Sequence, residues 1–298
     1  MVQKKKNIVI NIILSLACFI IAFPLLFAFL KATQTPGQVM SARLLPDIYL
    51  LENIKHVWFE YNFGTYLFNS FKISLSVMFG KTFLSFFAAF ALVFLDFKAK
   101  KPIFIFILIT LMMPTEMLIV GLFDIISLHP PESFGDFFSW FLNPKELFLA
   151  PTKYGFGWTD QPASIVVPFL ASATAVFLFR QHFNNIPSSL VDASIIDGAG
   201  PFRFIYHVLF PLSRNSIGAL FVVQFIYSWN QYLWPRVIIR NNSAQVIQVG
   251  LKAIIGNAEG VQWGQVMAGT LISMLPPLIM LLVFQNQFMK GIAVSDDK

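Results

Sequence analysis

The chain has 298 residues, of which 56% are hydrophobic and only 12% are charged, and its mean hydropathy is +0.68. A soluble domain carries about 25% charged residues, so this composition excludes an ordinary soluble protein and indicates a polytopic membrane protein. The net charge is +6, but in a membrane protein Lys and Arg mainly report orientation, so no nucleic-acid partner is expected.

The first apolar run extends from Ile8 to Leu30 and follows three lysines, Lys4 to Lys6. A signal peptide is the alternative interpretation, but the run is longer than a typical h-region and no small-residue cleavage site follows it. We therefore predict an uncleaved first span and then an outside loop to Thr65. The one cysteine, Cys18, lies in this run and is interpreted as a small apolar residue.

Five further apolar segments are long enough to cross a bilayer. They are residues 66–95, 102–123, 163–183, 215–234 and 265–289. The last contains Pro276 and Pro277, which a packed membrane bundle tolerates. The predicted fold is all-α, a polytopic chain with six transmembrane helices.

The distribution of Lys and Arg predicts which side of the membrane each loop faces. With the N-terminus inside, the inside segments hold eleven Lys and Arg, and the longer outside segments hold only eight. The inside segments are 1–7, 96–101, 180–214 and 290–298; the outside segments are 31–64, 124–162 and 236–264. Because Lys and Arg concentrate on the cytoplasmic side, both termini and residues 180–214 are predicted to be cytoplasmic.

Residues 180–214 interrupt the apolar pattern between the fourth and fifth spans. Gly198 and Gly200 allow a sharp reversal with positive φ, and Pro201 suits the first position of a short helix that stops before Pro211. A first short helix precedes the reversal. Two short helices with apolar and charged residues outside the membrane are suited to docking into a groove on a partner protein. The alternative is an ordinary loop between helices.

This segment resembles the coupling loop of ABC importer permeases, whose pattern is Glu-Ala-Ala, three residues, Gly, nine residues and Ile-x-Leu-Pro. The matching positions have the same spacing: Asp192, Ala193, Ser194, Gly198, Val208, Phe210 and Pro211. The sequence departs from the pattern with Asp for Glu, Ser for the second Ala, Val for Ile and Phe for Leu. The resemblance implies that residues 184–213, here called the 184–213 loop, couple the chain to an ATPase.

The resemblance also implies a role for individual residues of the 184–213 loop. Asp192 would anchor the first helix, Gly198 would set the bend, and the apolar face from Phe202 to Phe210 would pack into the ATPase. The complete set of candidate coupling residues is Asp192, Ala193, Ser194, Asp197, Gly198, Ala199, Phe202, Arg203, Val208, Phe210 and Pro211.

Other motifs resemble one subgroup of the carbohydrate-type permeases, the one that serves sn-glycerol-3-phosphate importers. They are Leu51-Glu52-Asn53-Ile54, Asn69-Ser70-Phe71, Met113-Pro114-Thr115-Glu116, Ala171-Ser172-Ala173-Thr174, Phe179-Arg180-Gln181 and the stretch Tyr227 to Pro235. The resemblance implies the type I permease fold, with an N-terminal span and outside loop (1–64), a permease core (65–290) and a cytoplasmic tail (291–298).

The same resemblance implies a bacterial inner-membrane subunit that forms half of a translocation pathway. Its expected partners are a paralogous permease, two ABC ATPases that bind ATP and Mg, an extracytoplasmic solute-binding protein and the lipid bilayer. The chain itself is expected to bind no cofactor or metal and to have no ATPase activity. The expected substrate is sn-glycerol-3-phosphate or a glycerophosphodiester, and the alternative is a neutral oligosaccharide.

Lys81 and Glu116 lie inside predicted spans, where charges are costly and often functional. We predict that Lys81 and Glu116 form an intramembrane ion pair; the alternative is that Lys81 faces the translocation path and attracts an anion. Gly80-Lys81-Thr82 resembles the end of a phosphate-binding loop, but its first glycine is missing, because position 75 is Leu. We therefore expect no nucleotide site there.

Trp229, Asn230, Gln231 and Tyr232 are candidate residues of the pathway lining, because amides supply donors and acceptors and aromatic faces stack on polyols. The alternative is an interfacial aromatic belt that includes Tyr232 and Trp234. A proton-driven secondary transporter is a different class, but it would usually show carboxylate relays or an inverted repeat. An integral membrane enzyme would need a clustered catalytic set, which the sequence does not suggest.

Overall fold

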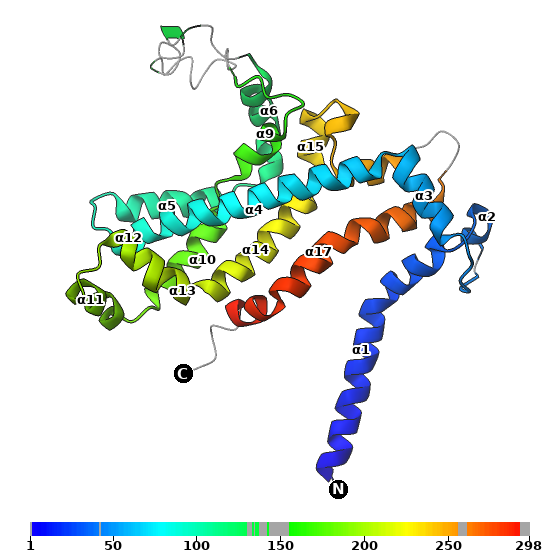
Figure 1. Cartoon of the computed structure of the whole chain (residues 1–298), viewed down its shortest axis with the longest axis horizontal. Coiled ribbons are helices and arrows are strands. Elements are labelled where there is room, and N and C mark those ends of the chain that lie inside the picture. Colours follow the sequence, from blue (N-terminus) through cyan, green and yellow to red (C-terminus); the bar gives the residue numbers. More distant parts are fainter. Residues whose placement is uncertain are drawn as a thin grey trace. The chain divides into compact units, whose positions relative to one another are not determined.

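The computed structural model describes residues 2–41, 43–129, 133, 135–136, 142, 155–255 and 261–292 (Figure 1). Within these residues every regular element is helical, as predicted. The helices are α1 (Val2–Ala32), α2 (Pro36–Val39), α3 (Leu50–Glu60), α4 (Phe63–Phe94), α5 (Lys100–Leu111), α6 (Ile119–Ser127), α9 (Pro162–Val166), α10 (Ala173–Asn184), α11 (Ser188–Ile196), α12 (Pro201–Phe204), α13 (Phe210–Leu212), α14 (Arg214–Trp229), α15 (Leu233–Ile238), α16 (Ile247–Ile255) and α17 (Trp263–Ile292). Short 3₁₀ turns are η1 (Thr115–Leu118), η2 (Val167–Phe169) and η4 (Asn242–Ala244), and η3 (Ile205–Leu209) is a π-helical turn.

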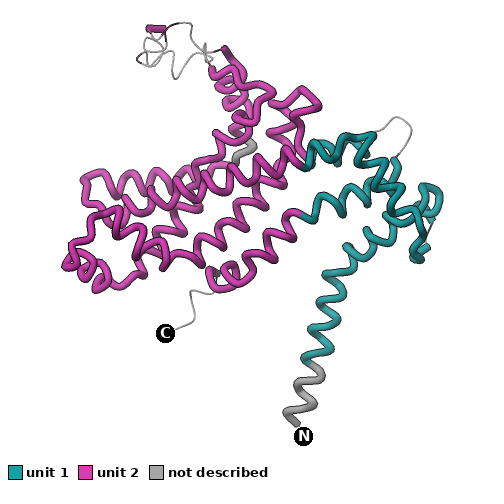
Figure 2. Tube along the Cα trace, in the orientation of Figure 1, with its two compact units in different colours: residues 1–67, 247–275 teal, residues 68–246, 276–298 magenta. Residues whose placement is uncertain are grey.

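The chain forms two units (Figure 2). Unit 1 comprises residues 1–67 and 247–275, and unit 2 comprises residues 68–246 and 276–298. Both candidate sites lie in unit 2. The predicted domains, divided at residues 64 and 290, are continuous segments of the chain. Each of the two units instead combines an early segment with a late one.

Unit 1 is organised at the end of α1 by Lys31, which is 4% exposed. Its ammonium donates hydrogen bonds to the Gln34 side chain at 3.2 Å and to the carbonyls of Ser41 and Arg43 at 2.9 and 3.0 Å. In the same loop, the Ile48 amide and then the Gln38 side chain donate to Asp47, and these bonds lower the pKa of the carboxyl. A buried charge with several acceptors fixes the loop that follows α1.

Within the described part of the chain, three helices are long and apolar enough to cross a membrane, and there are up to five spans if each of two bent pairs counts as one. The three are Ile10–Ala32, Phe63–Phe94 and Trp263–Gly291. The last stays helical through Pro276 and Pro277, as predicted. The pairs are Pro162–Phe169 with Ala173–Asn184, bent by 41°, and Pro201–Leu212 with Arg214–Trp229, bent by 73°. The predicted count of six spans is therefore not confirmed.

Prolines explain where the third and fifth predicted spans are interrupted. The predicted span 102–123 is divided, because α5 ends at Leu111 just before Met112-Met113-Pro114. Pro114 has no N–H to donate and disfavours helical geometry at the residue before it. In the same way α14 ends at Trp229, and α15 restarts at Leu233 with Pro235 in its first turn.

Phenylalanine rings form the core of unit 2. The ring of Phe86 meets those of Phe179 and Phe183 at centroid distances of 5.4 and 5.2 Å, both edge to face. Phe94 meets Phe204 at 5.2 Å in the same geometry. Such pairs add about 0.5–1.5 kcal/mol each beyond the area they bury. This core joins α4 and α10 to the 184–213 loop.

Candidate functional site: the 184–213 loop and two cavities

The 184–213 loop contains a short helix closed by a glycine turn. After α11, Gly198 has φ +69°, its amide donates to the Ile195 carbonyl at 3.0 Å, and the Ala199 amide donates to the Ser194 carbonyl at 2.9 Å. These two bonds around a left-handed residue define a Schellman motif, which satisfies carbonyls at the end of a helix. The predicted reversal at Gly198 is confirmed.

The prediction for Gly200 was wrong, because Gly200 has φ −70° and initiates α12 in extended geometry. The prediction that the second helix stops before Pro211 was also wrong. Helical backbone continues from Pro201 through η3 to Leu212. Proline in a helix clashes with the carbonyl four residues back, and the wider π-helical turn immediately before Pro211 accommodates it.

The second helix of the loop has an inward face and an outward face. Phe204 is 6% exposed and Leu209 is fully buried, both against the unit 2 core. Phe202, Tyr206 and Phe210, spaced by four residues, are 83%, 72% and 50% exposed. The predicted apolar face from Phe202 to Phe210 is therefore two faces, and only Phe202, Tyr206 and Phe210 are available to a partner.

The other candidate coupling residues divide by exposure. Asp192, Ala193, Asp197, Arg203 and Pro211 are exposed, and Ala199 and Val208 are half-buried. Ser194 is buried, and its hydroxyl donates to the Val191 carbonyl at 2.6 Å, so it supports α11 from within. The sequence interpretation omitted Ile195 and Ile196, which are 65% and 85% exposed. Two neighbouring isoleucines within a polar loop were the sequence signal for this exposed apolar surface.

A second candidate site surrounds Lys81 in α4. Lys81 is 6% exposed, and its ammonium lies 4.2 Å from the centre of the Tyr227 ring in a cation–π contact. The residue lines two cavities, which also share Ala171 and Tyr227. The first has a volume of about 670 Å³ and is bordered by η1, α6, η2 and the 230–234 segment; the second has about 820 Å³ and is bordered by α5, α10 and α14.

Three of the four candidate pathway residues, Asn230, Gln231 and Tyr232, line the first cavity. Trp229 does not: it is 2% exposed and stacks on Phe225 at 5.6 Å. The amide oxygen of Gln231 is buried and has no hydrogen-bond partner among the described residues. This part of the chain therefore presents polar groups to a cavity, as the pathway prediction requires.

The alternative of an interfacial belt disagrees with the position of Trp234. Its side chain is 4% exposed, and its indole N–H donates to the Ser164 carbonyl at 2.9 Å. A belt residue would have its ring at the membrane surface. Trp234 instead fastens α15 to α9.

The structure does not test the predicted ion pair of Lys81 with Glu116, because the side chain of Glu116 lies outside the part described. Among the side chains that it does describe, no carboxylate lies within 4.0 Å of the Lys81 ammonium. Gly80, Lys81 and Thr82 lie in the interior of α4. These three residues therefore form part of a helix and not a loop around a phosphate.

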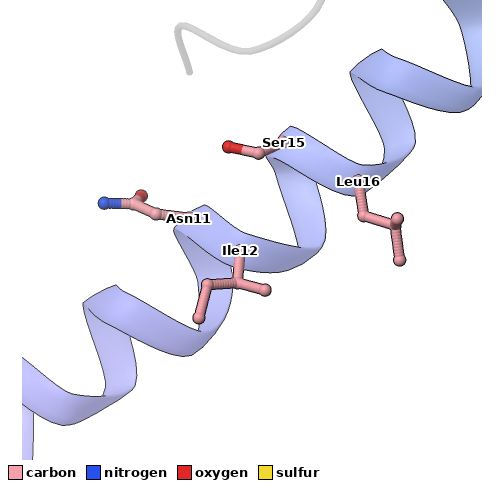
Figure 3. Close-up of a pocket in the computed structure, with 4 residues that line it drawn as sticks. All are labelled: Asn11, Ile12, Ser15 and Leu16. Atoms are coloured by element: carbon pink, nitrogen blue, oxygen red, sulfur yellow. The ribbon is translucent and has the colours of Figure 1, made fainter.

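Two further features carry no site. Asn11, Ile12, Ser15 and Leu16 border a surface depression, but all four side chains come from α1 alone (Figure 3). Across the described residues, no group of three His, Cys, Asp or Glu could hold a metal ion.

The sequence of the chain is similar to those of known transport proteins. The model of the family described as "binding-protein-dependent transport system inner membrane component" matches residues 81–293. The chain is 38% identical over 292 residues to the sn-glycerol-3-phosphate transport system permease protein UgpE of Escherichia coli O1:K1 / APEC, covering 95% of this chain and 94% of that protein. It is 36% identical over 307 residues to the protein of the same name from Salmonella choleraesuis (strain SC-B67), covering 99% and 100%.

Comparison with solved structures supports the fold. A chain of a bacterial ABC transporter involved in the import of the acidic polysaccharide alginate superposes with a TM-score of 0.72 at 21% identity, covering 95% of this chain and 96% of that one. A chain of the bacterial alginate ABC transporter in complex with alginate pentasaccharide-bound periplasmic protein superposes with a TM-score of 0.62 at 11% identity.

Proposed function

Because this chain belongs to the binding-protein-dependent transport system inner membrane component family, we propose that it forms half of the translocation pathway of an ATP-driven importer for sn-glycerol-3-phosphate. A solute-binding protein delivers the substrate to the outside loops, and a paralogous permease supplies the other half of the path. Two partner ATPases bind ATP and Mg and hydrolyse the nucleotide, and this chain transmits their motion. Both termini and the 184–213 loop lie in the cytoplasm in this proposal.

The observation that carries the proposal is the outward face of the 184–213 loop. Ile196, Phe202 and Tyr206 expose more than 70% of their surface, whereas Phe204 and Leu209 fix the same segment to the unit 2 core. α11, α12 and α13 lie at the far end of unit 2 from α6, α9 and α15 (Figure 1). An exposed apolar patch on a rigidly packed support suits a partner that pushes on it. Displacement of this patch would move α10 and α14 directly.

Replacement of Phe202 tests the docking role. We expect Phe202→Ser to reduce co-isolation of the ATPases by about tenfold, because exposed aromatic residues often dominate interface energy. The matched control is Ile48→Ser, since Ile48 is similarly exposed at 87% but lies in the predicted outside loop. Equal co-isolation for both variants would contradict docking at this face, as would labelling of Asp197 from the extracytoplasmic side.

The energy source and the substrate are tested separately. Uptake of sn-glycerol-3-phosphate by reconstituted wild-type transporter should survive collapse of the proton gradient and stop on ATP depletion. Uptake that follows the proton gradient would indicate a secondary transporter. Uptake of a neutral oligosaccharide in place of the phosphate ester would overturn the substrate assignment and leave the coupling proposal intact.

A further inference from the structure

Lys81 places one positive charge between the two cavities of unit 2. It is the only charged residue among the described residues that line either cavity. Its position in the middle of α4, a candidate membrane span, makes that charge costly unless something stabilises it. The face of the Tyr227 ring, 4.2 Å from the ammonium, stabilises the charge. A cation–π contact is weaker than an ion pair and leaves the ammonium able to attract an anion.

The surroundings of Lys81 suit a small anion with hydroxyl groups. In the first cavity Asn230, Gln231 and Tyr232 supply polar groups, and the Gln231 oxygen is buried without a partner. In the second cavity Ser172 and Gln224 are nearby polar groups, and the Gln224 amide lies 3.5 Å from the Ser172 hydroxyl. The remaining walls are mainly apolar, and a low local dielectric strengthens the attraction between an ammonium and a phosphate.

We propose that Lys81, seated on Tyr227, is a transient recognition site for the phosphate group of an organic phosphate substrate during its passage through the membrane. The hydroxyl groups, which lie on one side of a terminal phosphate, enter the first cavity, where Asn230, Gln231 and Tyr232 receive them. The inference rests on the function proposed above and adds a residue that selects for charge within the path itself.

A single lysine suits a site that must also release its substrate. An arginine can bind a phosphate with two parallel hydrogen bonds, whereas an ammonium acts as a point charge. Conduction requires binding strong enough to admit the substrate and weak enough to let it leave. The absence of a second cation among the described lining residues agrees with a passing contact.

The first experiment removes the charge in the assembled transporter. In proteoliposomes containing the partner permease, the ATPases and the binding protein, Lys81→Met should reduce ATP-driven uptake of sn-glycerol-3-phosphate by about tenfold or more. Lys81→Arg keeps the charge and should retain more uptake than Lys81→Met but less than wild type, because its two parallel hydrogen bonds to the phosphate slow release. ATP hydrolysis stimulated by loaded binding protein should change less than about twofold, because the 184–213 loop is untouched.

The matched control is Lys72→Met. Lys72 lies on the same helix but nine residues away, which is two and a half turns, so it faces the opposite side of α4. Its ammonium also sits over a phenyl ring, that of Phe68, at 4.5 Å. We expect Lys72→Met to transport normally. Equal losses for the two variants, or normal uptake by Lys81→Met, would overturn the proposal.

A chemical rescue separates loss of charge from loss of folding. The natural chain has one cysteine, Cys18, so Lys81→Cys is made in a Cys18→Ser background. Modification with aminoethyl methanethiosulfonate restores an ammonium at position 81 and should restore uptake, whereas the neutral methyl reagent should not. Substrate should slow the modification. Rescue by both reagents or by neither, in a variant that still assembles, would contradict an anion site.

Two other roles of Lys81 are tested separately. One is binding of a lipid headgroup phosphate, and the other is a structural ion pair with Glu116. If wild type retained a phospholipid in native mass spectrometry, Lys81→Met lost it and uptake was unchanged, the site would belong to lipid and the proposal would fail. Recovery of uptake in the double variant Lys81→Glu/Glu116→Lys would favour a structural pair and also overturn it. If wild type itself does not import sn-glycerol-3-phosphate, the proposed function fails and the site fails with it, whereas equal import by wild type and Lys81→Met overturns the site alone.

Discussion

The amide of Ala199 donates a hydrogen bond to the carbonyl of Ser194 at 2.9 Å, across the turn in which Gly198 has φ +69°. This bond ends α11 and directs the chain into α12, so it sets the angle between the two arms of the 184–213 loop. Apart from Gly198 itself and its two chain neighbours, no described atom would lie within 4 Å of a Cβ at this position. The backbone conformation, and not lack of space, is the reason for glycine.

Alanine at Gly198 should destabilise the turn by about 1–2 kcal/mol, because an L-residue in the left-handed region brings its Cβ close to the backbone. Alanine at Gly200 is the matched control, since φ there is −70° and the space is equally open. Thermal unfolding of the purified transporter measures both variants. Equal melting temperatures would contradict the strain argument.

The same geometry predicts the functional effect of an aspartate at position 198. Asp tolerates the left-handed region better than Ala does, so the turn should survive, but a second carboxylate then lies beside Asp197 on the exposed surface. We expect Gly198→Asp to insert in the membrane normally and to lose transport, with Gly198→Asn retaining it. Immunoblots of membrane fractions measure insertion, and normal uptake by Gly198→Asp would end the coupling argument.

Phe202 and Phe204 should respond in opposite ways to the same substitution. Phe204→Ala should lower the stability of unit 2 by about 3–5 kcal/mol, because it empties a buried site against Phe94. Phe202→Ala should change stability by less than about 0.5 kcal/mol and impair ATPase binding instead. Chemical denaturation and co-isolation together distinguish the two; a stable Phe204→Ala protein would contradict the core assignment.

The sequence predicted the reversal at Gly198, because glycine spacing and a following proline are local signals. It could not distinguish the faces of the second helix. Phe202, Phe204 and Phe210 are chemically alike, and only packing against Phe94 and the rest of the core buries Phe204. The π-helical turn before Pro211 was equally hidden, because it depends on continuation of the helix into tertiary contacts.

The polar lining of the first cavity was partly predictable, because some of its residues form a local sequence signal and others do not. Asn230 and Gln231 stand out within an apolar stretch, and both line the first cavity. Trp229, beside them in sequence, turns into the protein against Phe225, because consecutive residues at a helix end point in different directions. The contact of Lys81 with Tyr227 joins residues far apart in sequence, and no local pattern contains it.

The side chain of Trp234 takes the place of a backbone N–H donor that Pro168 lacks. The Ser164 carbonyl would normally accept from the amide of residue 168, but that residue is Pro168 and has no N–H. The indole of Trp234 donates instead, at 2.9 Å. Trp234→Phe should therefore cost about 1–3 kcal/mol for the unsatisfied buried carbonyl. Adding Pro168→Ala should recover part of this loss, and a double-mutant cycle with no coupling energy would contradict the arrangement.

Gly218 lies where α14 packs directly on α17. A Cβ at this position would collide with the Cβ of Gln287 and lie 2.8 Å from its Cγ. Gly218→Ala should therefore destabilise unit 2 by about 1–3 kcal/mol, because the two helices must separate. Gly121→Ala in α6 is the matched control: outside its own helix backbone, no described atom lies within 4 Å of a Cβ there, so the better helix propensity of alanine should stabilise by about 0.5–1 kcal/mol. Opposite shifts in the melting temperature are expected. Shifts of the same sign would mean that α14 and α17 are not in close contact at Gly218, and that movement of the 184–213 loop need not be transmitted to α17.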